Sequence, residues 1–517
     1  VWTHSFFLAE LGAPQRFTIS RSKMVLFGEP EKATDTDSAE KILQDYFSTM
    51  PVARMQWVDS TPWRINEIVV NTETGPTLVG SEGERVSSTS DPDRWNIIKH
   101  QFALRMNLAN TGRGLTYTWP SEGDSSPYSF GTSVASGWVM NDDGTYSDLD
   151  NAPYAAGWTG WTAMWLGECG NTFIHEVGHS ATLLHFTSGT ALSWGVAEEY
   201  PLDGTHVEGH PWGFDTTREQ FRTWYRVNGS GPVINEFGAY QGKRDPMNGG
   251  ESPSSAHCFP QYVPYHAAQI QRWSQDTQTI MTVDDTPGVY RWNPATRTHD
   301  PVDISSEPYQ PPSEVDVPAA TIIGALGPSA DSRRIYPPIY WSSANVFELP
   351  NPEDAGLHSV YDDAQFFLTI THSDDSVEHA LIAKSDISDE NLYLFSLNIE
   401  TDKEPTNISL WLSPTGYPHI DIEGASLQHE LVITEPTDPI PDPVLVGRGH
   451  FPNGDIELGE WCESDFDCDI RYQENTWRLS SRPIHFTKAD DDITDSVVCS
   501  DDGDWTDLSI EVINELD

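Results

Sequence analysis

Two histidines four residues apart, with a third shortly after them, constrain this chain more than any other feature. In NTFIHEVGHSATLLHF, Glu176 follows His175 directly, His179 comes three residues later, and His185 follows six residues after His179. Residues four apart share one face of a helix, so the first two imidazoles can bind a single metal ion. Glu176 would lie beside them, within reach of a metal-bound water. The stretch predicts a zinc-dependent hydrolase.

The five-residue motif alone also occurs by chance in ordinary helices, so the third histidine matters. To reach the same metal, His185 needs the helix to end near Thr182 and the chain to turn back. Metzincin proteases make this turn with glycine, which tolerates left-handed backbone angles. Thr182 stands at that position here, although β-branched residues disfavour such angles. We expect His175, His179 and His185 to bind Zn²⁺, with Glu176 as the general base.

A glutamate could complete the site instead of the third histidine. In gluzincins a glutamate about twenty residues beyond the second histidine is the third ligand, and Glu198 and Glu199 lie 19 and 20 residues beyond His179. Against this alternative, RDPMNGG (244–250) is similar to the methionine turn that runs beneath the zinc in metzincins. A plain surface turn would also use its proline and glycines. With the third histidine present, we favour the metzincin arrangement, in which Met247 is structural.

Several stretches outside the histidine motif carry a wider similarity. They are KILQDYFSTMPVARMQW, RDPMNGGESPSSAHCF, AAQIQRWSQ, YRWNPATRTHDPVD and IYPPIYW. Together with FIHEVGHSATLLHF, they resemble the StcE/TagA family of secreted bacterial metalloproteases over roughly residues 1–350. The resemblance implies a secreted zinc endopeptidase, with mucin-type, densely O-glycosylated proteins as its substrates.

Aromatic residues near the motif are candidates for substrate contact. Trp158 and Trp161 lie beside glycines, and indole faces suit stacking against sugar rings, although packing beneath the helix would also use them. Directly after the third histidine, the resemblance implies a tyrosine that faces the substrate glycan, and this chain has Phe186 there. The apolar ring is kept and the hydroxyl is lost. Glycan dependence therefore has less support than proteolysis.

Two other functions stay open. A general zinc protease without glycan dependence would use the same ligands, and the missing hydroxyl at Phe186 leaves room for it. A carbohydrate-binding or adhesion protein with a structural zinc would account for the 19 tryptophans. Structural zinc sites are usually closed by four protein ligands, so the intact Glu176 favours catalysis.

Charge and hydropathy exclude several kinds of partner. The 517 residues include 79 acidic and 29 basic side chains, a formal net charge of −50 that would repel nucleic-acid phosphates. Salt would screen the repulsion between these acidic side chains, so we hypothesise a marine or halophilic source. A stability optimum in low-salt buffer would contradict this hypothesis. The sequence has no apolar run of about 18 residues, the length that a membrane-spanning helix needs. The chain begins at Val1 without a signal peptide, so we expect a mature chain whose leader has been removed. Secretion is implied by the family resemblance, and we expect a monomer.

The expected fold class is α+β. A zincin- or metzincin-like catalytic domain over 1–350 would combine a mixed sheet with the active-site helix, and further helices are expected at 91–108 and 264–275. The segment 134–140 is predicted to be a strand along the cleft that pairs with extended substrate. Small all-β domains would follow: short alternating runs predict an immunoglobulin-like β-sandwich at 355–437, and 445–517 would form a small acidic β domain.

Overall fold

The computed structural model describes most of the chain between residues 16 and 446. The long described stretches are 16–29, 54–72, 75–82, 94–111, 130–148, 171–185, 264–307, 311–383 and 392–446, with shorter pieces such as 155–158, 161–164 and 246–248. The structural statements below concern these residues. Among the described helices, none combines the length and the apolar character that crossing a membrane requires.

One large mixed sheet lies next to the histidine-bearing helix. Its strands are β2 (Arg16–Leu26), β3 (Arg54–Asp59), β4 (Trp63–Ile65), β7 (Gly131–Met140), β8 (Tyr146–Asp148), β9 (Ala155–Trp158), β10 (Trp161–Met164) and β26 (Val444–Val446). They follow the order β26-β3-β2-β7-β10-β9, with β4 paired to β2 and β8 paired to β7. The neighbours β3, β2, β7 and β10 run parallel, whereas β26, β8 and β9 run antiparallel to their partners.

Helices α2 (Arg94–Asn110) and α3 (Asn171–Ser180) cover opposite faces of this sheet. Successive side chains of a strand point to opposite faces, so one strand can serve two cores. In β2, Phe17 and Ile19 belong to the core that includes the apolar side of α3. Met24 and Leu26 belong to the core that includes α2. The part of the chain that carries the histidine motif is therefore a helix–sheet–helix layer structure.

Strand β7 corrects one expectation. It contains the segment 134–140 that we expected to pair with substrate, but hydrogen bonds to β2 occupy one of its edges along most of its length. Its other edge pairs with β10 near the start and with β8 near the end. The alternation of side chains identified a strand but not its position in the sheet, and β7 is interior. Within the described residues, the edge strand on the α3 side is β9, which pairs with β10.

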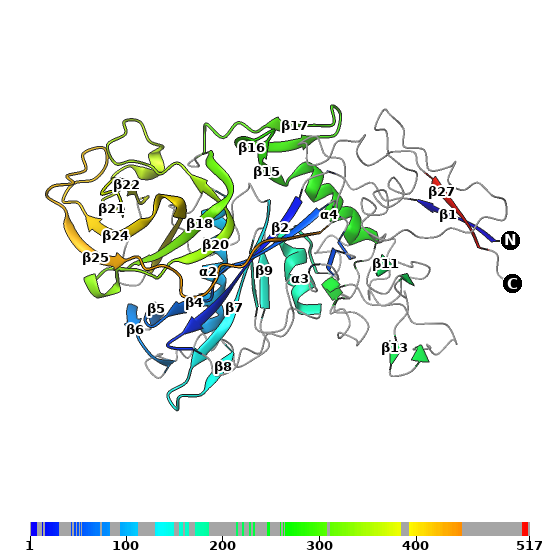
Figure 1. Ribbon diagram of the computed structural model, residues 1–517, viewed down its shortest axis with the longest axis horizontal. Coiled ribbons are helices and arrows are strands. Elements are labelled where there is room, and N and C mark those ends of the chain that lie inside the picture. Colours follow the sequence, from blue (N-terminus) through cyan, green and yellow to red (C-terminus); the bar gives the residue numbers. More distant parts are fainter. Residues whose placement is uncertain are drawn as a thin grey trace.

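Two four-stranded sheets enclose a separate core at one end of the molecule (Figure 1). One contains β18 (Pro312–Leu326), β19 (Arg334–Ile335), β20 (Ile339–Phe347) and β23 (Tyr393–Glu400). The other contains β21 (Phe366–His372), β22 (Val377–Leu381), β24 (Pro405–Leu412) and β25 (Ser426–Val432). Strands β18 and β20 come before residue 350 yet share this core with the later strands. The division of the chain into domains stays a prediction.

Helix α2 links the two parts of the molecule. It packs on β7 and β10 of the large sheet and on β20 and β23 of the other. At its C-terminal end, Asn110 accepts a hydrogen bond on Oδ1 from Asn398 Nδ2 (2.9 Å) and one on its carbonyl from Asn345 Nδ2 (3.1 Å). All three asparagines are buried. A satisfied polar network therefore ties the helix to the strands that follow it by more than 200 residues.

The remaining elements flank these layers. They are β5 (Ile68–Thr72) with β6 (Gly75–Val79), the short helix η3 (Pro246–Asn248), helix α4 (Pro264–Asp276), and the three-stranded sheet of β15 (Thr279–Val283), β16 (Thr286–Asn293) and β17 (Thr298–Pro301). Short pairs join β11 (Phe214–Asp215) to β12 (Gln220–Phe221), β13 (Val227–Asn228) to β14 (Gly231–Pro232), and β1 (Trp2–Phe7) to β27 (Ser509–Asn514). Most of the described secondary structure is β, and the expected mixed sheet with its adjoining helix is present.

Candidate metal centre

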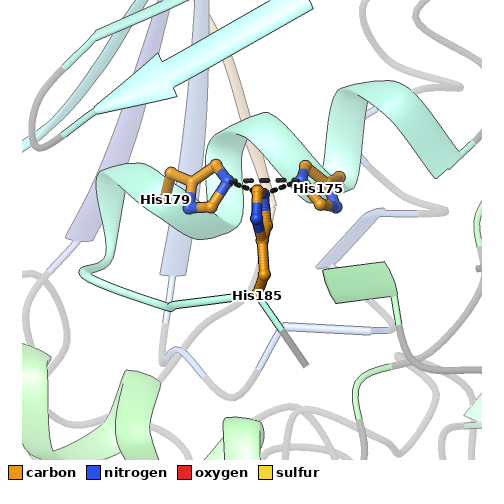
Figure 2. A group of neighbouring side chains, drawn as sticks. All are labelled: His175, His179 and His185. Atoms are coloured by element: carbon orange, nitrogen blue, oxygen red, sulfur yellow. Dashed lines mark hydrogen bonds between the residues drawn. The ribbon is translucent and has the colours of Figure 1, made fainter. Parts of the chain in front are cut away.

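The three histidines of the motif converge on one point. His175 and His179 project from α3, and His185 returns from the segment after the helix (Figure 2). The Nε2 atoms of His175 and His179 are 3.2 Å apart, and each lies 3.1 Å from Nε2 of His185. Three nitrogens at about 2.0–2.1 Å from a tetrahedral zinc would be separated by about 3.3 Å. The observed spacing fits that geometry.

Hydrogen bonds at the far side of two rings set their tautomers. Nδ1 of His175 lies 2.8 Å from the Pro246 carbonyl, and Nδ1 of His179 lies 2.7 Å from the Leu183 carbonyl. A carbonyl only accepts, so both Nδ1 atoms carry hydrogen and, in the neutral rings, both Nε2 atoms present lone pairs. The 3.2 Å contact between these two Nε2 atoms is therefore a meeting of two acceptors. Such a contact is repulsive unless a cation lies between the nitrogens.

Burial keeps His179 and His185 in the neutral form that binds metal. Burial, with a smaller contribution from neighbouring His175, lowers the pKa of His179 to about 4. Burial also lowers the pKa of His185. Protons therefore do not compete for these nitrogens near neutral pH. The donor set, its spacing and its protonation state fit a zinc ion.

The turn that returns His185 is a Schellman motif. The Leu183 N–H donates to the Gly178 carbonyl (3.1 Å), and the Thr182 N–H donates to the His179 carbonyl (2.9 Å). This pair of bonds ends a helix that is followed by a residue with left-handed backbone angles, here Thr182, and glycine usually occupies that position. Thr182 adopts a φ of 66°. The backbone makes the turn that metzincins make with glycine, and it does so with a β-branched residue.

Gly178 lies against the floor of the site. A Cβ added there would lie 2.8 Å from Sδ of Met247 and 3.1 Å from the hydroxyl oxygen of Tyr262. Met247, in η3, is buried in the same core as α3. Tyr262 donates its hydroxyl hydrogen to the Ile174 carbonyl at 2.5 Å. The glycine within HEVGH is therefore required by the close approach of the methionine and tyrosine side chains.

Sequence reasoning passed over Gly178, Tyr262 and the carbonyl of Pro246. A glycine inside a helix costs about 1 kcal/mol relative to alanine, so its presence in HEVGH was a signal of close packing. For the tyrosine there was no such signal, because it bonds to a residue 88 positions earlier.

The other predicted site residues divide into described and undescribed positions. Glu176 lies in α3 between His175 and His179, and the residue is 8% exposed. Trp158 and Trp161 occupy facing positions of the β9–β10 hairpin, next to α3. Phe186, Glu198 and Glu199 lie outside the described residues. The structure therefore brings together the three histidines and places the two tryptophans on neighbouring strands.

Comparison with known proteins assigns the chain to a family. Residues 3–279, more than half of the chain, match the Peptidase M66 family. The chain belongs to the Peptidase M66 family. Residues 310–412, which include β18 and β20, match the ToxR activated gene A (TagA) lipoprotein domain. The similarity expected from the motifs is thus confirmed.

Two of the relatives that the chain resembles are Metalloprotease StcE and Dictomallein. The chain is 25% identical to Metalloprotease StcE of Escherichia coli O157:H7 over 299 residues, covering 56% of this chain and 31% of that protein. It is 23% identical to Dictomallein of Burkholderia pseudomallei (strain 668) over 289 residues, covering 47% of this chain and 41% of the relative. The chain spans less than half the length of these relatives. Family membership and similarity to a metalloprotease agree with the presence of a histidine cluster that could hold a metal ion.

Proposed function

We propose that this peptidase is a secreted zinc endopeptidase of the metzincin type that hydrolyses peptide bonds in O-glycosylated, mucin-like glycoproteins. The observation that carries the proposal is the convergence of three Nε2 atoms within 3.1–3.2 Å of one another. The mucin-type substrate comes from the resemblance to the StcE/TagA family. The strongly acidic chain, with a net charge of −50, is not expected to bind nucleic acid.

Each residue of the centre has a proposed task. His175, His179 and His185 would hold Zn²⁺, which supplies Lewis-acid chemistry when bound. The carboxylate of Glu176 would take a proton from the attacking water and deliver it to the leaving amine. Met247 would support the helix from below without binding the metal.

The metzincin type is supported by the order of the elements around the site. The helix with two histidines ends in a left-handed turn, the third histidine follows, and a buried methionine packs against the helix. The edge strand β9 lies next to α3, so an extended substrate backbone could add to its open side. Trp158, Trp161 and Phe186 are proposed to contact the substrate near this edge.

Two alternatives use the same residues differently. A general zinc protease would share the ligands and Glu176 but would not need glycans, and Phe186 in place of a tyrosine supports it. A carbohydrate-binding or adhesion protein would hold the zinc only as a structural ion. Among the residues that the structure describes, three histidines converge and would leave a tetrahedral zinc one ligand short, which supports catalysis over a closed structural site.

One cleavage experiment separates these functions. A mucin-domain glycoprotein is incubated with the enzyme before and after enzymatic removal of its O-glycans, and Glu176→Gln serves as the inactive control. Cleavage of the glycosylated form alone, absent in the variant, supports the proposal. Equal cleavage of both forms supports the general protease. Zinc binding without cleavage of either form refutes the peptidase function and supports the binding protein.

A further inference from the structure

We infer that Tyr262 is a positioning residue for the metal centre, because its hydroxyl bonds to the backbone of α3 directly before His175 and lies close to Gly178, directly before His179. The inference rests on the proposed zinc site. Tyr262 follows Met247 in the chain by 15 residues, and its side chain is 2% exposed. Its ring packs in the core cluster that contains Phe173, Ile174 and Val177 of α3.

The hydroxyl meets the helix at two successive turns. It donates to the carbonyl of Ile174, the residue directly before His175. The hydroxyl oxygen also lies 3.1 Å from the point where a Cβ of Gly178 would be, and Gly178 directly precedes His179. One buried atom is therefore bonded to the residue before His175 and leaves little room for a side chain at the residue before His179. A shift of Tyr262 would move both points from which the imidazoles project.

This contact is not needed to satisfy the carbonyl it bonds. In an α-helix the carbonyl of residue i accepts from the N–H of residue i+4, which for Ile174 is the N–H of Gly178. A carbonyl oxygen has two lone pairs, so the tyrosine adds a second donor. Helix α3 has only 10 residues, and a short helix depends on tertiary contacts for its position. The added bond fixes where the helix lies.

The second fixed point is the methionine loop. Nδ1 of His175 donates to the carbonyl of Pro246 in η3 (2.8 Å), and Met247 Sδ packs against Gly178. Tyr262 and η3 thus hold α3 from two places, and His185 follows the helix because the turn at Thr182 is built on helix carbonyls. Partners of this kind commonly change metal affinity by about 10–100-fold when removed.

The test compares Tyr262→Phe with the matched change Tyr336→Phe in the full chain. Tyr336 is also buried, and its hydroxyl accepts a hydrogen bond from the Val69 N–H (3.0 Å) in the core on the other face of the sheet. Zinc affinity is measured by competition with a chromophoric chelator, and the visible spectrum of the Co²⁺-loaded protein reports ligand geometry. Urea midpoints measured with metal removed show how much each change destabilises the fold.

For Tyr262→Phe we expect zinc to bind about 10-fold more weakly, with an altered Co²⁺ spectrum. Tyr336→Phe should lower the urea midpoint and leave both metal readouts unchanged. Unchanged zinc affinity and Co²⁺ spectrum in Tyr262→Phe would overturn the inference while leaving the proposed function intact. If the unaltered protein binds no zinc, the inference and the proposed function both fall.

A second variant covers the case in which Tyr262→Phe does not fold. Gly178→Ala keeps the tyrosine hydroxyl but places a methyl group 3.1 Å from it and 2.8 Å from Met247 Sδ. Displacement of the hydroxyl should again weaken zinc binding and alter the Co²⁺ spectrum. Full zinc affinity with an unchanged spectrum in this variant would count against the positioning role.

Discussion

Replacing Thr182 by glycine should stabilise the protein. Thr182 holds a φ of 66° and its side chain is exposed, so the substitution removes a strained Cβ without removing buried packing. Left-handed angles cost a residue with a Cβ roughly 1–2 kcal/mol. Glycine also lowers the free energy of unfolding by about 0.4–1 kcal/mol, because it gives the unfolded chain more conformational freedom. We expect a net increase of about 0.5–1 kcal/mol in the free energy of unfolding.

The assay is urea unfolding with zinc removed by a chelator, so that metal binding does not add to the measured stability. Thr182→Ala is the matched control: it removes the β-branch but keeps the Cβ that causes the strain. The glycine variant should have a higher urea midpoint than the original protein, with an unchanged dependence of the free energy on urea. The alanine variant should stay close to the original.

The reasoning would be refuted if alanine stabilised the protein as much as glycine, because then the β-branch and not the Cβ would cause the cost. Zinc affinity gives an independent check. The glycine variant should bind zinc as tightly as the original, because the left-handed turn that returns His185 is retained.

Three further outcomes follow from the structure. His185→Ala should weaken zinc binding by more than about 100-fold, the upper end of the effect of supporting residues, as measured by chelator competition. A chain ending at residue 350 should be less soluble than one ending at 446, because it loses β23 and exposes the core face of β18; matched expression and light scattering will test this. Burial lowers the pKa of His299 to about 4, so the folded protein binds this proton less readily than the unfolded chain does. The stability that depends on neutral His299 is therefore fully present above about pH 6.5 and is lost as the pH falls toward 4. The urea midpoint of His299→Gln should fall less over this pH range than that of the original protein.

Local patterns predicted the helices well because their signals are local. The helix expected at 91–108 is α2, Arg94–Asn110, and that expected at 264–275 is α4, Pro264–Asp276. The spacing of the histidines likewise predicted their convergence, since four residues make about one helical turn. The sequence also showed that Thr182 stands where metzincins have glycine. It did not show whether the backbone at Thr182 would adopt the left-handed angle that the turn needs.

Long-range pairing was the part that the sequence did not reveal. The alternation in β7 is the same for an edge strand and for an interior strand, so its two neighbours could not be read from it. Strand β18 pairs with β23 from Ala319 opposite Glu400 to Leu326 opposite Tyr393, and no local pattern joins segments so far apart. The bond from Tyr262 to Ile174 belongs to the same class. Such contacts depend on the folded topology.

The position of His185, the proposed third ligand, depends more on Leu183 than on the residue that makes the turn. The Leu183 N–H donates to the Gly178 carbonyl, and its own carbonyl accepts from Nδ1 of His179 (2.7 Å). Both its N–H and its carbonyl are therefore bonded to the helix that carries His175 and His179, and His185 is only two residues further on. A net contribution of about 1 kcal/mol from each of these bonds is comparable to the strain at Thr182. These two hydrogen bonds, one within the backbone and one from the His179 imidazole, can thus hold a left-handed threonine in place. The turn favours glycine at this position but also forms with threonine, and it depends on the two hydrogen bonds of Leu183.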